Sequence, residues 1–146
     1  MTPLKEGGFL IAKVHQLAGR IFAKKLKKYQ LDQINPAQGR ILFSLWQKDN
    51  VPINELAKMT SLGNSTLTSM LDRLETSGYI KRVPHGKDRR KIIVQRTEKE
   101  SEMRDIYEKA SQEMIDLFYA GFKQEEIEIF EKNLKRILNT LEHFQG

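Results

Sequence analysis

Cysteine is absent from this chain of 146 residues, which excludes disulfides, thiolate metal sites and a switch based on cysteine oxidation. Long apolar runs are missing too: the patch FLIA near the start is short, and no segment approaches the roughly 20 apolar residues of a membrane span. We therefore expect a cytoplasmic protein. Its length suits about one domain.

Signatures of catalysis and metal binding are equally scarce. The three histidines, His15, His85 and His143, lie far apart and show no ligand spacing such as H-x-x-x-H. The chain contains no nucleophile elbow, glycine-rich phosphate loop or zinc-hydrolase motif. We expect no metal, no cofactor and no enzymatic activity.

Charge is distributed unevenly along the chain. Up to Arg96 there are 18 Lys and Arg against 7 Asp and Glu, whereas from Thr97 onward there are 7 against 12. The first two thirds are therefore strongly positive and the last third is negative. Such a split suits a protein that holds its first part against a polyanion and its last part away from it.

Apolar residues at helical spacing predict a first helix over residues 9–30 and a second over residues 37–48. Asn35 is the expected cap of the second helix, and Pro36 suits its first position. Trp46 on that helix is more simply a core residue than a ligand platform. A short third helix is expected over residues 55–59.

A fourth helix follows a turn at residues 60–63 that ends in glycine. We expect Asn64 to cap this helix and Gly78 to end it. Two short helices joined by such a turn are typical of a helix-turn-helix unit.

The fourth helix has two different faces. Leu67, Met70, Leu71 and Leu74 fall on one side, which predicts a buried stripe. The small polar side chains left outside are of the types that hydrogen-bond base edges and phosphates in the major groove. The candidate residues for this contact are Asn64, Ser65, Thr66, Thr68, Ser69 and Arg73.

After Tyr79 the apolar period changes to two, which predicts two antiparallel strands joined by the turn PHGKDRR. An arginine at the tip of such a hairpin can enter the narrow minor groove of A·T-rich DNA. A neighbouring carboxylate would fix the direction of that guanidinium. A solvated charged turn is the plainer alternative. The candidate wing residues are Lys87, Asp88, Arg89, Arg90 and Lys91.

Two long helices are expected over residues 98–119 and 124–144, each with a sustained apolar stripe. Stripes of this length indicate dimerisation, although packing within one chain alone is an alternative. We expect residues 1–34 and 98–146 to form a dimerisation region around a DNA-binding domain at 35–97. The candidate dimer residues are Leu10, Val14, Leu17, Ile127, Phe130, Leu134, Ile137 and Leu141.

Three segments together resemble the MarR family of bacterial and archaeal transcription regulators: INELAKMT, NSTLTSMLDRLETSGYIKR and DRRKIIVQRT. Within the last segment Asp88 and Arg90 match the D-x-R of the family, and Thr97 matches its closing threonine. The resemblance implies a mainly α fold with a small antiparallel β-wing, a winged helix-turn-helix with long dimerisation helices.

The same resemblance implies a homodimer in which the first, fifth and sixth helices interlock. The helix over residues 64–77 would enter the major groove, and Arg90, oriented by Asp88, would reach the minor groove. Two positions depart from the family pattern: Arg96 stands where leucine is usual, and Glu100 where glycine is frequent. The base of the wing is then expected either to pack differently or to touch phosphate.

These features predict a regulator that binds a pseudo-palindromic duplex site, a repressor relieved by a small-molecule effector. Family members often respond to small aromatic acids bound between the dimer helices and the DNA-binding lobe. His15, Arg20 and Trp46 are possible lining residues, but nothing selects them over core or surface roles. The alternatives are a winged helix for protein contacts and a small-molecule-binding helical dimer without DNA.

Overall fold

The computed structural model describes residues 2–88 and 90–145. The chain divides into two compact units, Met1–Ser111 and Gln112–Gly146. This division follows compactness, so the grouping of residues 1–34 with 98–146 as one dimerisation region stays a prediction. We describe each unit by itself.

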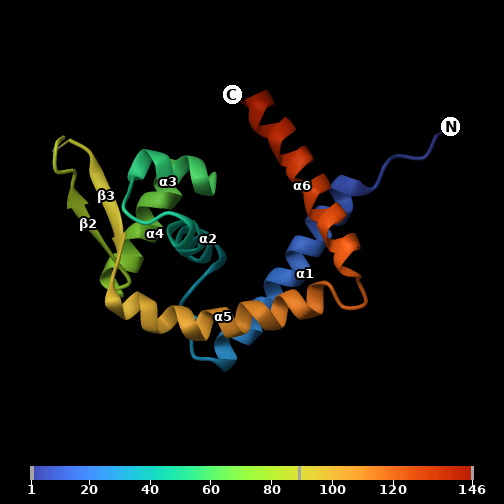
Figure 1. Ribbon diagram of the computed structural model, residues 1–146, viewed down its shortest axis with the longest axis horizontal. Coiled ribbons are helices and arrows are strands. Elements are labelled where there is room, and N and C mark those ends of the chain that lie inside the picture. Colours follow the sequence, from blue (N-terminus) through green and yellow to red (C-terminus); the bar gives the residue numbers. More distant parts are fainter. Residues whose placement is uncertain (1, 89, 146) are drawn as a thin grey trace. The chain divides into compact units, whose positions relative to one another are not determined.

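The first unit contains most of the elements and the whole β-sheet (Figure 1). The described fold is mainly α-helical with a small antiparallel sheet, as predicted. In chain order the elements are α1 (Gly7–Lys28), α2 (Pro36–Gln47), β1 (Val51–Pro52), α3 (Ile53–Thr60), α4 (Asn64–Thr76), β2 (Ile80–Pro84), β3 (Ile92–Arg96), α5 (Glu98–Phe118) and α6 (Gln124–Gln145).

The first two helices lie close to their predicted ranges. α1 begins two residues early and ends at Lys28, because Gln30 has a φ of 60° and cannot continue a helix. α2 begins with the predicted cap: the backbone N–H of Gln38 donates to Asn35 Oδ1 at 2.8 Å. The backbone N–H of Asn35 donates in return to Gln38 Oε1 at 2.8 Å, which completes a capping box.

The start of α4 differs from the prediction. Gly63 is the N-cap, in an extended conformation, and its carbonyl accepts the first helical hydrogen bond from Leu67 N–H at 2.9 Å. Asn64 is already helical, so the prediction that its side chain caps α4 is wrong. A capping side chain must come from the residue just outside the helix. The predicted range of α3, 55–59, was also too short, because Pro52 serves as its N-cap.

Gly78 ends α4 as predicted. Its φ of +83° is in the left-handed region that favours glycine. Gly78 N–H donates to the carbonyl of Glu75 and Tyr79 N–H to that of Leu74, each at 2.9 Å, which is the Schellman arrangement. The chain therefore turns back directly into β2.

The sheet has the strand order β1-β3-β2 and is antiparallel throughout. The hairpin of β2 and β3 was predicted as two antiparallel strands. The structure adds its register, in which Arg82 lies opposite Val94. β1 was not, because two residues are too few to show an alternating pattern. Its pairing of Val51 with Val94 attaches the wing to the helical part of the unit.

The core of the first unit is built from aliphatic residues of α2, α3 and α4 and from aromatic residues that join three helices. Phe22 of α1 contacts Tyr107 of α5 edge to face at 5.6 Å between ring centroids. Tyr107 contacts Trp46 of α2 at 5.4 Å. Trp46 is half-buried against the core, as predicted. These ring contacts hold α1, α2 and α5 together.

The second unit contains the end of α5 and all of α6. Phe118, Tyr119 and Phe130 pack edge to face or tilted, and the hydroxyl of Tyr119 donates to Glu131 at 2.7 Å. Burial, with help from that carboxylate, raises the pKa of Tyr119 to about 12. No residue of α6 is buried within the chain, although the helix carries a long apolar stripe.

Candidate nucleic-acid interface

The outward face of α4 is polar along its length. Leu67, Met70, Leu71 and Leu74 are buried in the core, as predicted. Their burial turns the opposite face to solvent, and all six candidate residues lie exposed on it: Asn64, Ser65, Thr66, Thr68, Ser69 and Arg73. The predicted orientation of the helix is confirmed, and its contact with DNA stays a prediction.

A cation on β2 holds the wing to α4. The guanidinium of Arg82 donates to Asp72 Oδ1 at 2.7 Å and to Glu75 Oε1 at 2.8 Å. The backbone N–H of Arg82 donates to the other oxygen of Glu75 at 3.0 Å. The hydrogen bonds from Arg82 lower the pKa of the Glu75 carboxyl and raise that of the guanidinium. Two elements that would face different grooves are thus joined by one side chain.

The wing tip presents its cations to solvent. The side chain of Arg90 is 94% exposed, and its Nε lies 3.5 Å from Asp88 Oδ1. The same oxygen accepts a hydrogen bond from the backbone N–H of Arg90 at 3.1 Å. Asp88 therefore contacts Arg90 as predicted, although through one oxygen and not in a bidentate pair. Arg89 lies outside the described residues.

Backbone hydrogen bonds at the tip converge on His85. Its own N–H donates to the carbonyl of Lys91 at 2.8 Å. Its ring Nδ1 accepts from the backbone N–H groups of Lys87 at 3.1 Å and Asp88 at 3.2 Å. Metal binding was the only role that we weighed for this histidine from the sequence. A histidine that accepts hydrogen bonds from nearby backbone N–H groups needs no particular residue spacing, so the sequence could not have revealed this role.

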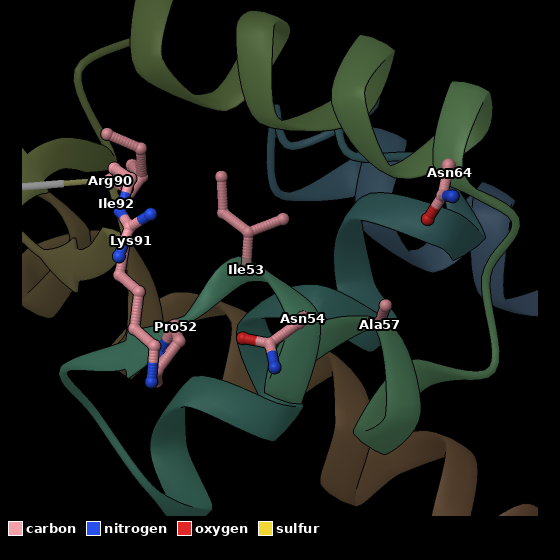
Figure 2. Close-up of a pocket in the computed structure, with 8 residues that line it drawn as sticks. All are labelled: Pro52, Ile53, Asn54, Ala57, Asn64, Arg90, Lys91 and Ile92. Carbon is pink, nitrogen blue, oxygen red and sulfur yellow. The ribbon is translucent and has the colours of Figure 1, made fainter.

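A pocket of about 410 Å³ lies between the helix-turn-helix and the wing. In Figure 2 the wing residues stand at one side of it and Asn64 at the other, with the side chain of Ile53 between them. The lining combines apolar side chains with amides and cations: Pro52, Ile53, Asn54, Ala57, Asn64, Arg90, Lys91 and Ile92.

Known proteins match both the sequence and this arrangement. The sequence profile of the MarR family matches residues 34–92. The multiple antibiotic resistance protein MarR of Salmonella typhimurium is 30% identical over 132 residues, which cover 90% of this chain and 90% of that protein. This chain belongs to the MarR family. The winged helix-turn-helix predicted from its motifs is therefore confirmed.

A further relative and a solved structure extend the comparison. An uncharacterized HTH-type transcriptional regulator of Bacillus subtilis, YfiV, is 36% identical over 81 residues, 55% of this chain and 50% of the relative. The chain thus spans about half the length of this relative. The crystal structure of a mutant MarR from Escherichia coli complexed with operator DNA aligns with a TM-score of 0.75 and 27% identity. That alignment covers 94% of this chain and 99% of the other.

The two departures from the MarR pattern lie together at the base of the wing. Arg96 Nη1 lies 3.6 Å from Glu100 Oε2, and Arg96 Nε lies 3.5 Å from Asp49 Oδ2. Glu100 is fully buried, and the indole N–H of Trp46 donates to its other oxygen. Arg96 is only 25% exposed. At the base of this wing Arg96 is turned to carboxylates of its own chain.

The three residues considered for an effector site, His15, Arg20 and Trp46, differ in their exposure and their contacts. His15 and Arg20 are exposed on α1, while Trp46 is engaged by Glu100 and Tyr107. Among residues 2–88 and 90–145, no group of three His, Cys, Asp or Glu is placed to hold a metal ion. Within the same residues, no helix has the length and apolar character to cross a membrane.

Proposed function

We propose that this MarR-family chain is a sequence-specific DNA-binding regulator of transcription that acts as a homodimer on a pseudo-palindromic operator. The observation that carries the proposal is the joining, through Arg82, of a polar helix face to a hairpin tipped by Arg90. A regulator of this kind acts on cytoplasmic DNA and needs no catalytic residues. The MarR structure with operator DNA supports the same use of the fold.

Each element has a proposed partner on the duplex. The exposed hydroxyls and amide of α4 would read base edges in the major groove, while Arg90 enters the adjacent minor groove. The sugar-phosphate backbone that separates the two grooves would then cross the pocket between α4 and the wing. Ile53 and Ile92 offer an apolar floor for deoxyribose, and Asn54 and Lys91 offer donors for phosphate.

The homodimer is proposed from apolar surface that the chain leaves uncovered. A single helix with several exposed large apolar side chains on one face is typical of a subunit interface. On α1 the exposed residues are Phe9, Leu10, Ile11, Val14, Leu17 and Ile21. On α6 they are Ile129, Ile137, Leu138, Leu141 and Phe144, while Ile127, Phe130 and Leu134 are half-buried.

Repression and its relief by a small molecule form the finer part of the proposal. A dimer seated on a promoter blocks access to it, so occupancy alone is enough for repression. A small aromatic acid is the proposed effector class, because an apolar floor beside Arg90 and Lys91 suits an aromatic ring with a carboxylate. Bound in that pocket, it would occupy the place proposed for the DNA backbone.

Selection of bound fragments from a random duplex pool tests the proposal. We expect enrichment of a pseudo-palindrome whose half-sites are about 10 base pairs apart, one turn of B-DNA. Thr66→Ala and Ser69→Ala variants, selected in parallel, should enrich altered sequences, because these side chains face the groove. Failure to enrich any duplex, or binding without sequence preference, would contradict a sequence-specific regulator.

The two competing functions give different results in the same experiments. A winged helix for protein contacts would present apolar side chains outward on α4, and that face is polar. A small-molecule-binding dimer without DNA would show thermal shifts with phenolic acids and no retention of any duplex. Only a regulator is expected to bind the selected duplex and to release it when the effector is added.

A further inference from the structure

The tip of the β2–β3 hairpin is folded around one ring nitrogen. Nδ1 of His85 accepts from the backbone N–H groups of Lys87 and Asp88 at 3.1 and 3.2 Å. The backbone N–H of His85 donates across the hairpin to Lys91. The side chain thereby closes the turn from inside, in the way that an Asn or Asp side chain closes an Asx turn.

Only one protonation state of the ring can make these two bonds. An imidazole nitrogen accepts a hydrogen bond only when it carries no proton, and both ring nitrogens carry a proton in the imidazolium. Protonation of Nδ1 would point an N–H at two backbone N–H groups. The ring would have to rotate away, and the amides of Lys87 and Asp88 would lose their acceptor.

The consequence reaches the arginine at the tip. Asp88, whose N–H is bonded to the ring, is the residue whose carboxylate accepts from the backbone of Arg90 and contacts its Nε. A chain of hydrogen bonds thus runs from His85 through Asp88 to Arg90. Release of the first bond frees the other two residues to move.

We propose that His85 is a positioning residue of the wing, and that its protonation weakens DNA binding by releasing the tip that carries Arg90. This inference rests on the proposed function, since it concerns the same interface. Among the described residues of the tip, the charged side chains are those of Lys87, Asp88, Arg90 and Lys91. The neighbour of His85 on β2 is the uncharged Pro84.

The expected change of DNA affinity on acidification is opposite in sign to the change that charge attraction alone would give. An extra positive charge on a DNA-binding surface strengthens attraction to phosphate, so a histidine that merely faces DNA would improve binding on acidification. The positioning role of His85 predicts that binding weakens. The test compares binding between pH 8 and pH 5.5, the range in which histidine is the side chain that commonly changes charge.

Two variants of His85 make the test. The selected duplex is titrated with each protein between pH 8 and pH 5.5 at constant ionic strength. The unmodified chain should lose affinity about tenfold, as expected for two backbone hydrogen bonds. His85→Asn, which keeps an acceptor that does not titrate, should bind as the unmodified chain does at pH 8 and lose little at pH 5.5. His85→Ala should bind weakly at both.

An equal acid loss in His85→Asn, or stronger binding of the unmodified chain at pH 5.5, would overturn the inference. A second measurement needs no DNA: the backbone amide resonances of Lys87 and Asp88 should titrate together with the His85 ring. If the ring titrates and these amides do not move, the positioning role is wrong. A chain whose amides titrate as expected but which binds no duplex at any pH would instead refute the proposed function.

Discussion

The hydroxyl of Tyr107 leaves no room for a side chain on Gly39 of α2. A Cβ placed on Gly39 would lie 2.6 Å from the hydroxyl oxygen and 3.6 Å from the ring carbon that bears it. Burial of Tyr107 raises its pKa to about 12, so the neutral hydroxyl is present at any ordinary pH. The close approach of α2 and α5 therefore requires glycine at position 39, because the methyl group of an alanine there would collide with the Tyr107 hydroxyl.

We predict that Gly39→Ala lowers the free energy of unfolding by about 1–3 kcal/mol, the usual result of overpacking a core. Adding Tyr107→Phe removes the atom in conflict and should recover most of the loss. Urea unfolding of the two single variants and the double variant measures this coupling. Losses that simply add would show that the hydroxyl is not the cause.

A substitution of Arg90 is expected to change DNA affinity without changing the stability of the fold. Its side chain is almost fully exposed, so Arg90→Ala should leave the unfolding midpoint unchanged. Binding should weaken by about 1–3 kcal/mol on a duplex with A·T-rich flanks and by less on G·C-rich flanks, because a narrow A·T groove attracts arginine most. Lys87→Ala is the matched control and should weaken binding to both duplexes equally. Equal losses for Arg90→Ala would argue against minor-groove insertion.

The elements of the DNA-binding region are joined at two points along the wing. Arg82 links β2 to α4 near the middle of the hairpin. At its base Arg96 links β3 to α5 and to Asp49, in the segment between α2 and β1. The two links differ in burial: Glu75 and Asp72 are open to solvent, whereas Glu100 is fully buried. A buried carboxylate depends much more on its cation than an exposed one does.

We predict strong coupling between Arg96 and Glu100. Arg96→Leu alone should cost about 3 kcal/mol of stability, because it leaves a buried carboxylate without its cation. Glu100→Gln keeps the acceptor for the Trp46 indole, so the double variant should be more stable than Arg96→Leu alone. A double-mutant cycle by urea unfolding gives the coupling energy. Additive losses would mean that the two residues do not compensate each other.

Periodic features of the elements were predictable from the sequence, and contacts between distant residues were not. The buried stripe of α4 and the two strands of the wing follow from spacing that repeats within a few residues. The pairing of Arg96 with Asp49 joins positions 47 residues apart, and no local pattern reports it. β1 was too short to recognise, and Asn64 was assigned a cap position one residue from the true one. The exposed polar face of α4 was predicted correctly because burial of one face determines the other.

At the scale of the whole molecule, the exposed apolar surface of α6 is the surface that we propose a second copy of the chain covers. Leu141 is 60% exposed within the chain, so a charge there should not unfold the protomer. We predict that Leu141→Glu shifts the protein from dimer to monomer. Asn139→Glu adds the same charge at an exposed position on another side of the helix and should leave the dimer intact. Light scattering coupled to gel filtration distinguishes the two results, and a dimeric Leu141→Glu would place the interface elsewhere.

The proposed dimer also leads to an expectation for the strength of operator binding. When one protomer of a dimer has bound a half-site through its α4 and wing, the α4 and wing of the second protomer are held near the other half-site. Their effective concentration at that half-site is therefore raised. Linked binding of this kind strengthens overall affinity by about 10²–10⁴-fold over a single module. The Leu141→Glu monomer should therefore bind the full operator no better than a half-site and lose about that factor, with Arg90 and the α4 side chains all present. If the monomer binds as tightly as the dimer, each protomer recognises DNA alone and the two-fold symmetry of the site has no energetic role.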